Sequence, residues 1–425
     1  MGRSWPEMTP SRSNIEKGDV KHGVFSSQES QAAVTENSGC LYRVPHRLRE
    51  VNEKAYEPNV VSIGPYHHGK QHLKAMQVIK RSFFGKIAEE NNLNVNELAR
   101  TMRSLEPRIR KCYEEAGFYL DSVELVEIML LDGCFIVQLI QGIYPVDDLF
   151  QVGRIQTDIR HDLLLLENQL PFFVLFELYL MMVPNSGGDV HHLARSALSF
   201  FKISHFPSPK TDIIHLLDLV HSCQHPSPLG IKKHEEFKAK EAAAVQASTA
   251  VVVAAAKPNS QRSWKFMRSA TELEGAGISF FGDHIEKMKD QNQGIESLFR
   301  NYMAYEQFFP RGKPTYFVDY VVFMDNLINT GKDVQLLCES GVIDNWLGDD
   351  EAVALMFNKL RDSIYMMSED FYYADIFDRV NEHCHRKWNK WKAALKKNYF
   401  NTPCKTKAKV HQAPFGLAFT IQRKP

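Results

Sequence analysis

The sequence predicts a mainly α-helical protein: a large multi-helix globular domain with few short strands. Apolar residues recur at helical spacing through most of the chain after residue 40. Two mid-chain segments are too apolar for helices that face solvent, so they are expected to lie at the centre of a core. The chain has 425 residues, of which 44% are hydrophobic, and this suffices to bury a large core.

The expected organisation is one helical unit between two polar tails. Residues 1–39 are rich in Ser, Glu, Lys and Gln, which predicts a disordered N-terminal tail. The helical unit covers residues 40–400. An Ala/Val-rich, low-complexity insertion at 235–260 marks the place where this unit would divide if it were bilobal. Residues 401–425 form a basic, polar C-terminal tail.

The first amphipathic helix is expected within residues 94–115. Its apolar residues are spaced alternately by three and four positions, which places them on one face of a helix. They are Val95, Leu98, Met102, Leu105, Ile109 and Cys112. Pro107 interrupts the pattern, so the helix is expected to kink or split there.

The two most apolar segments follow at residues 122–144 and 163–183. The first is predicted to be a central core element that stops before Pro145. The second contains the triplet Glu167-Asn168-Gln169 just before Pro171, and proline is favoured in the first turn of a helix. We interpret this triplet as a helix junction buried between apolar flanks. Neither segment is expected to span a membrane, because one is too short and the other is interrupted by charged residues.

The later helices are delimited by capping residues. Ser269 or Thr271 is expected to cap one helix, and Asp349 or Asp350 to cap another. Between them, residues 316–328 predict a long apolar helix.

The charges are balanced overall, with 51 basic and 51 acidic side chains. This total gives no general attraction to nucleic acid or acidic lipid. Seven scattered cysteines without a Cys-x-x-Cys pair indicate a reducing compartment, and no apolar leader typical of secretion is present. The distribution is uneven, however, because residues 386–425 contain eleven Lys or Arg and no Asp or Glu.

The segment "VSIGPYHHGK", residues 61–70, contains two adjacent histidines beside Gly64 and Pro65. A metal site is disfavoured because His67 and His68 point in different directions on any regular element and lack further ligands at a suitable spacing. A single glycine followed by proline also does not make a phosphate-binding loop. We therefore interpret the segment as a structural turn, and no metal or cofactor is expected.

No complete catalytic constellation is recognisable in the sequence, so no catalytic residue is assigned. The nucleophile elbow of hydrolases, the phosphate-binding loop of nucleotide hydrolases and the kinase signature set are all absent. One alternative stays open. An unrecognised hydrolase or transferase would have a cleft in which the polar residues of two motifs converge: His67, His68, Glu167 and Asn168.

Residues 386–400, "RKWNKWKAALKKNYF", predict a basic amphipathic helix. Trp388, Trp391, Leu395 and Tyr399 share one face, and the candidate interface cations are Lys387, Lys390, Lys392, Lys396 and Lys397. Such a helix suits the interface of an anionic membrane. Equally, the aromatic face could dock on the core of the domain. Nucleic acid is not expected as a partner, because no recognition module accompanies the basic tail.

Nine motifs in order resemble the plant domain-of-unknown-function 247 family, from about Tyr42 to Pro403. They are "YRVPHRLREVN", "PNVVSIGPYHHGK", "MLLDGCFIVQLI", "DLLLLENQLPFFVL", "RSATELEGAGISF", "NYMAYEQ", "VVFMDNLINTGKDVQLL", "GVIDNWLGDDEAVALMFNKL" and "WNKWKAALKKNYFNTP". The resemblance implies a predominantly α-helical plant protein without established enzymatic activity. It supplies no agreed catalytic residues.

Family resemblance also implies a C-terminal transmembrane helix and the plasma membrane, and some grass members are linked to self-incompatibility. This chain departs from the family pattern after "YFNTP", where its sequence is too polar to insert into a bilayer. The segment around residues 280–295 is also shorter than in relatives. We therefore expect a non-enzymatic recognition or signalling protein with an unknown protein partner, attached peripherally to the plasma membrane or else cytoplasmic.

Overall fold

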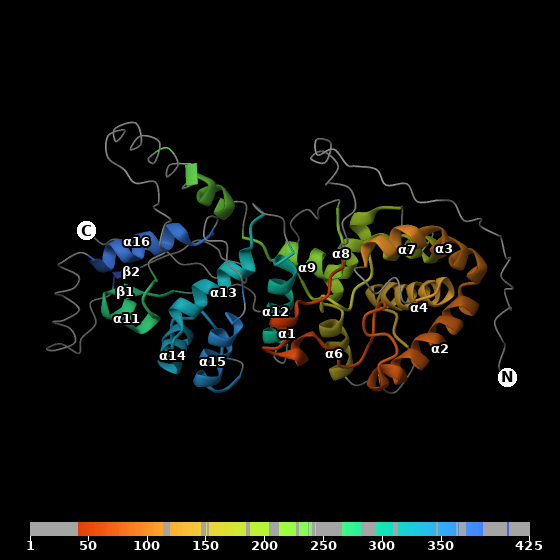
Figure 1. Cartoon of the computed structure of the whole chain (residues 1–425), viewed down its shortest axis with the longest axis horizontal. Helices are drawn as coiled ribbons and strands as arrows, with labels where there is room; N and C mark the ends of the chain where they lie inside the picture. Colours follow the sequence, from red (N-terminus) through yellow and green to blue (C-terminus); the bar gives the residue numbers. More distant parts are fainter. Residues whose placement is uncertain are drawn as a thin grey trace, which may run out of the picture. The chain divides into compact units, whose positions relative to one another are not determined.

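The most apolar segment of the chain forms α4 (Ser122–Ile140), which lies at the centre of one group of helices in the computed structural model (Figure 1). A capping box starts this helix: the side chain of Asp121 accepts a hydrogen bond from the backbone of Glu124 at 2.8 Å, and the Glu124 carboxylate accepts one from the backbone of Asp121 at 3.3 Å. From Ile128 to Ile140 every residue is buried. The predicted central core element is confirmed.

The structure divides the chain into two units, Met1–Ser38 and Gly39–Pro425, and all residues described below belong to the second. The described residues are 41–113, 120–145, 150, 153–183, 188–203, 212–226, 229–236, 238–239, 243, 266–281, 294–308, 313–345, 347–362, 364, 371–385 and 406–407.

Among the described helices, four make the main contacts with α4 (Figure 1). They are α2 (Lys74–Glu90), α3 (Val95–Cys112), α7 (Phe172–Met182) and α8 (Val190–Phe200). The predicted apolar face of α3 buries Leu98, Met102 and Ile109. Pro107 does not split this helix, which continues to Cys112 although proline cannot donate to the carbonyl one turn earlier. Packing of the apolar face on α4 and α7 outweighs that lost hydrogen bond.

A second group of helices follows residue 265 (Figure 1). Its members are α11 (Ala270–Gly275), α12 (Ile295–Glu306), α13 (Tyr316–Leu327), α14 (Gly331–Glu339), α15 (Asp350–Leu360) and α16 (Ala374–His385). The predicted caps are confirmed at Ser269 for α11 and at Asp349 for α15. The only sheet among the described residues pairs β1 (Ile278–Ser279) in parallel with β2 (Thr406–Lys407), with Ile278 opposite Thr406. The mainly α-helical fold class is therefore confirmed.

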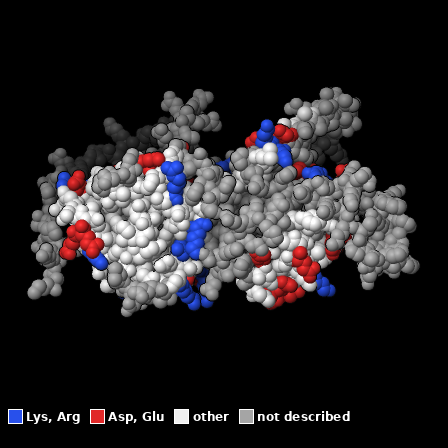
Figure 2. Space-filling view, turned by 180° about the vertical axis from the view of Figure 1, so that it is seen from behind, with Lys and Arg blue, Asp and Glu red and all other residues white. Residues whose placement is uncertain are grey.

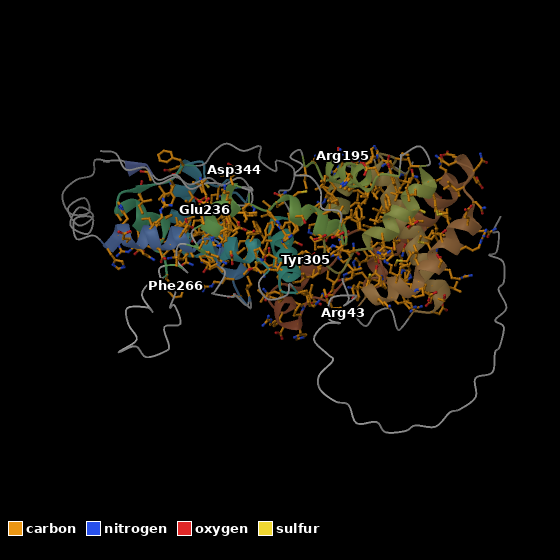
Figure 3. All side chains as sticks on the ribbon, turned by 90° about the horizontal axis from the view of Figure 1, so that it is seen from above. Arg43, Arg195, Glu236, Phe266, Tyr305 and Asp344 are labelled. Carbon is orange, nitrogen blue, oxygen red and sulfur yellow. The ribbon has the colours of Figure 1, made fainter. Side chains whose placement is uncertain are left out.

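Short elements near the start of the described chain connect the two groups. The single turns are α1 (His46–Arg49), η1 (Glu53–Tyr56) and η2 (Gln71–Leu73), and η1 packs on α12. The amide of Asn301 on α12 donates to the carbonyl of Ala55 at 2.9 Å, and its oxygen accepts from the backbone of Leu166 at 2.8 Å. Residues of both groups share one hydrophobic core, and side chains fill the space between the ribbons (Figure 3).

The predicted junction at residues 167–171 lies between α6 (Gly153–Asp162) and α7. Every residue from Leu163 to Phe172 is buried, which confirms the interpretation of a junction enclosed by apolar flanks. Pro171 lies at the N-cap of α7, with an extended backbone that leads directly into the helix.

Several predictions fall on residues outside the described part. They concern the 1–39 tail, most of the 235–260 insertion, the 386–400 helix with its tryptophans and lysines, the 401–425 tail apart from β2, and most of the 280–295 segment. Within the described part, no helix combines the length and apolarity needed to cross a membrane. Charges of both signs are spread over the face shown in Figure 2, in keeping with the balanced composition.

Candidate functional site

The segment at residues 61–70 forms the predicted turn. Gly64 and Gly69 both have positive φ, at +68° and +79°, a conformation that favours glycine. Gly64 also needs its lack of a side chain, because a Cβ there would lie 2.8 Å from the carbonyl oxygen of Gln169. The turn is therefore pressed closely against the buried junction that precedes α7.

Buried polar side chains of that junction and of the end of α6 bind the backbone that leads into the turn. The carboxylate of Asp162 accepts hydrogen bonds of 2.7–2.9 Å from the backbone amides of residues 59–61. The side chain of Asn168 accepts from the amide of Ile63 at 2.7 Å and donates to the carbonyls of Val61 and Asp162. Sequence-distant loops are thus fixed to each other by satisfied buried polar groups.

A buried ion pair holds the turn from the other side. Lys80 of α2 contacts Asp132 of α4, and both side chains are essentially inaccessible to solvent. The ammonium of Lys80 also donates to the carbonyl of Ser62 at 2.8 Å, and Asp132 accepts from the amide of Gly64 at 2.9 Å. Burial lowers the pKa of Lys80 and raises that of Asp132, and their mutual attraction opposes both shifts.

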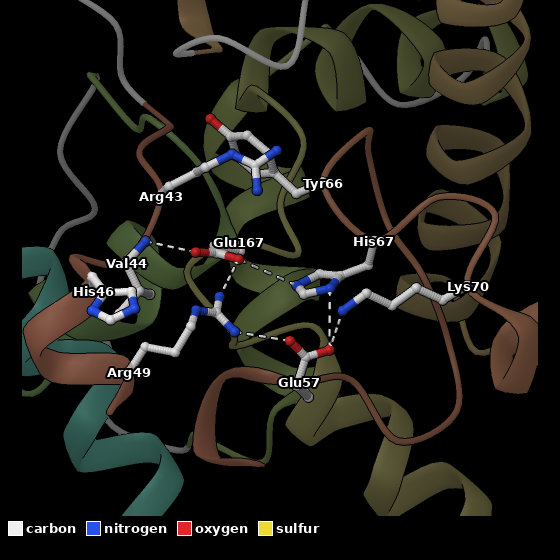
Figure 4. A pocket seen from close by; sticks show the side chains of 9 residues that line it. All are labelled: Arg43, Val44, His46, Arg49, Glu57, Tyr66, His67, Lys70 and Glu167. Atoms are coloured by element: carbon white, nitrogen blue, oxygen red, sulfur yellow. Dashed lines mark hydrogen bonds and ion pairs between the residues drawn. The ribbon is translucent and has the colours of Figure 1, made fainter. Parts of the chain in front are cut away.

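The outer side of the turn faces a cavity of about 270 Å³ (Figure 4). Its lining combines cationic, anionic and aromatic side chains from the start of the described chain, from the turn and from the junction. The lining residues are Arg43, Val44, His46, Arg49, Glu57, Tyr66, His67, Lys70 and Glu167.

Arg49 joins the two carboxylates of this cavity (Figure 4). Its guanidinium donates to Glu57 at 2.8 Å and to Glu167 at 2.5 Å. The second oxygen of Glu167 accepts from the backbone of Val44 at 2.6 Å, and the second oxygen of Glu57 contacts Lys70. Burial alone would raise the pKa of Glu57, but the bonds from Lys70 and Arg49 hold it below its ordinary value. Both carboxylates are therefore paired with cationic side chains.

The imidazole of His67 lies between the same carboxylates but is hydrogen-bonded to neither. Nδ1 is 3.5 Å from Glu57 and Nε2 is 3.7 Å from Glu167, distances too long for good hydrogen bonds. The side chain is 1% exposed, and neither ring nitrogen has a hydrogen-bond partner among the described residues. Burial, followed by the charges of Lys70 and Arg49, lowers the pKa of His67 to about 3. The ring is neutral at physiological pH.

Arg43 lies at the rim of the cavity. Its guanidinium is 4.8 Å from the centre of the Tyr66 ring, a cation–π contact, and the side chain is exposed. Tyr66 in turn donates to the carbonyl of Leu41 at 2.7 Å, which fixes the ring. Arg43 contacts no carboxylate among the residues that the structure describes.

The structure brings together two of the four candidate pocket residues. His67 and Glu167 line the cavity, whereas His68 contacts Gln77 at 3.1 Å on the exposed side of the turn and Asn168 binds backbone groups. Sequence reasoning missed Arg43, Arg49 and Glu57. No short-range signal marks them, since the contact between Arg49 and Glu167 spans 118 residues. Within the described ranges, no three side chains of His, Cys, Asp or Glu are arranged to hold a metal ion.

A second buried polar cluster joins α9 (Leu216–Cys223), α12 and α13. The carboxylate of Glu306 accepts from the backbone of Phe317 at 3.0 Å and of Val318 at 2.9 Å, and it lies 2.9 Å from Nε2 of His221. Burial raises the pKa of Glu306 to about 8 despite these donors. A proton shared by Glu306 and His221 is consistent with both facts. The cluster lies in the core and lines no described cavity.

Comparison with known proteins identifies relatives along most of the chain. Residues 41–413 match the DUF247 family, described as plant protein of unknown function. The UPF0481 protein At3g47200 of Arabidopsis thaliana is 30% identical over 393 residues, which cover 86% of this chain and 81% of that protein. The putative UPF0481 protein At3g02645 of the same plant is 24% identical over 443 residues, which cover 82% of each. No solved structure matches significantly. This chain belongs to the DUF247 family of plant proteins, as the order of its motifs indicates.

Proposed function

We propose that this chain is a non-enzymatic recognition protein that acts at the periphery of the plant cell and attaches peripherally to the membrane there. Its helical body would present a binding surface to a protein partner, with the buried polar network keeping that body rigid. Membership of a family of unknown function is compatible with this role.

The proposal rests on one observation: the polar groups at the turn are already bonded to other groups of the protein. A catalytic carboxylate or imidazole needs a free face toward substrate and a pKa near the working pH. Both oxygens of Glu167 are bonded, to Val44 and to Arg49, and those of Asp162 bind backbone amides. His67 has a pKa of about 3, so its neutral ring is a poor acceptor for a substrate proton at pH 7.

Membrane attachment is proposed to occur through residues 386–400, for which the sequence predicts a basic amphipathic helix. Purified full-length chain is expected to float with phosphatidylserine-rich vesicles and to be released by high salt, because each lysine near such a surface contributes about 1 kcal/mol at low ionic strength. Substitution of both Trp388 and Trp391 by Ala is expected to abolish flotation. Vesicles of neutral lipid and the variant Phe266→Ala, which removes an exposed aromatic elsewhere, are the controls.

Unchanged flotation of the double Trp variant would show that this helix is not the anchor and would leave the alternative, docking of its aromatic face on the core. A fluorescent fusion in plant cells tests location directly. A uniform cytoplasmic signal would overturn the peripheral placement.

The alternative function, a hydrolase or transferase, is favoured by one observation: His67 and Glu167 line the same cavity. Under this alternative the imidazole would accept a proton from a nucleophile. His67→Gln keeps a polar side chain of similar reach but cannot act as a base. We expect wild type and His67→Gln to give equal, background turnover of generic ester and phosphoester substrates. Turnover by the wild type that falls at least about 100-fold in the variant would support the enzyme instead.

A further inference from the structure

One positive charge at the cavity beside the turn is not balanced by the other side chains of the lining. Arg49 and Lys70 pair with Glu57 and Glu167, so these four charges cancel. The remaining cation is Arg43, which among the described residues contacts the face of Tyr66 and no carboxylate.

The other titratable groups at this cavity do not change that balance. The ring of His67 is neutral. His46, at the exposed edge of the lining, lies 3.3 Å from the carboxylate of Glu50, the C-cap residue of the same short helix. An anionic ligand would therefore offset this positive charge.

The cavity also contains an unsatisfied hydrogen-bonding group. Both nitrogens of His67 are buried without a partner among the described residues, which is an unfavourable state for a polar group. A neutral imidazole has one N–H, so it can donate to a ligand oxygen that enters the cavity. Glu57 and Glu167 are close to the ring, but Arg49 holds their carboxylates too far from the ring nitrogens for good hydrogen bonds (Figure 4).

The remaining lining is suited to an apolar group. The ring of Tyr66 and the side chain of Val44 contribute aromatic and aliphatic surface. A volume of about 270 Å³ lies just below the range for small-molecule pockets, which begins at about 300 Å³. An ion alone would fill little of this space.

We propose that this cavity binds a small organic anion. Its carboxylate or phosphate group pairs with Arg43 and accepts a hydrogen bond from His67, and its apolar part packs against Tyr66 and Val44. The site is independent of the proposed membrane attachment, because none of its residues lies in the 386–400 helix.

Calorimetric titration of the full-length chain with four probes tests this site. Benzoate and phenyl phosphate carry the two acid groups on an apolar ring, benzamide is a neutral analogue of benzoate, and inorganic phosphate lacks the ring. We expect saturable binding of at least one aromatic anion at about 1 mM, which corresponds to about 4 kcal/mol of binding free energy. Benzamide and inorganic phosphate should bind at least tenfold more weakly. The aromatic anion that binds better identifies the acid group.

The variant Arg43→Gln should weaken that binding at least tenfold. Because Arg43 is exposed, its replacement should not unfold the protein, so the weaker binding would reflect loss of the charge. Arg47→Gln is the matched control, since it removes the same charge from a neighbouring exposed arginine that contacts Gln307 and does not line the cavity. The proposal is overturned by the absence of saturable binding, by equal binding of benzamide, or by equal losses in the two variants.

Discussion

Replacement of Asp132 by Asn is expected to destabilise the protein by about 3–5 kcal/mol. The substitution leaves the ammonium of Lys80 in the core without its counter-charge, and removal of one partner from a buried pair costs about this much. It also weakens the acceptor for the amide of Gly64. Urea unfolding followed by circular dichroism measures the loss as a lower midpoint at unchanged slope.

Two further variants test whether the loss of stability comes from the broken ion pair or from any substitution in this region. The double variant Lys80→Met, Asp132→Leu removes both charges together and should recover more than half of the loss, because buried pairs contribute little net stability over apolar residues. Arg81→Gln removes a neighbouring exposed pair with Glu127 and should cost no more than about 1 kcal/mol. A double variant less stable than Asp132→Asn would mean that the charges themselves stabilise the fold.

The helical body could be predicted because local patterns determine it. The alternating spacing of Leu98, Met102 and Ile109 already defines the buried face of α3, and the continuous apolar run of α4 requires burial on all sides. The effect of Pro107 on the helix could not be predicted from local patterns alone. Propensity predicts a break, whereas tertiary packing of the apolar face keeps the helix continuous.

The cavity could not be predicted in the same way, because its contacts are distant in sequence. The pattern around His67 and His68 indicates that they point in different directions, but only the positions of Glu57 and Glu167 show that His67 is the buried one. The position of Lys80 in the sequence does indicate a buried ion pair. It falls on the apolar stripe of α2, between Met76 and Phe83, where a lysine implies a buried partner.

Stability is also expected to depend on pH through Glu306. Its pKa is raised from 4.5 to about 8 in the folded protein, so between these values the folded chain keeps a proton that the unfolded chain has released. This contribution is fully present below pH 4.5 and is lost as pH rises through 8. At about 1.4 kcal/mol for each pKa unit, the loss reaches up to about 5 kcal/mol. His67 and His215, with pKa values of about 3 and about 4, act in the opposite sense in acid: their contribution rises with pH up to about 6.5.

The variant Glu306→Gln isolates this term, because the neutral amide resembles the protonated acid at every pH. Its oxygen can accept from Phe317 and Val318, and its amide can donate to His221. Urea unfolding at pH 5 and pH 9 should give similar stabilities for wild type and variant at the lower pH and a more stable variant, by several kcal/mol, at the higher pH. Glu89→Gln, on the exposed end of α2, should show no such divergence. A constant difference between wild type and Glu306→Gln from pH 5 to pH 9 would mean that the three donors around the carboxylate outweigh its burial and keep it ionised.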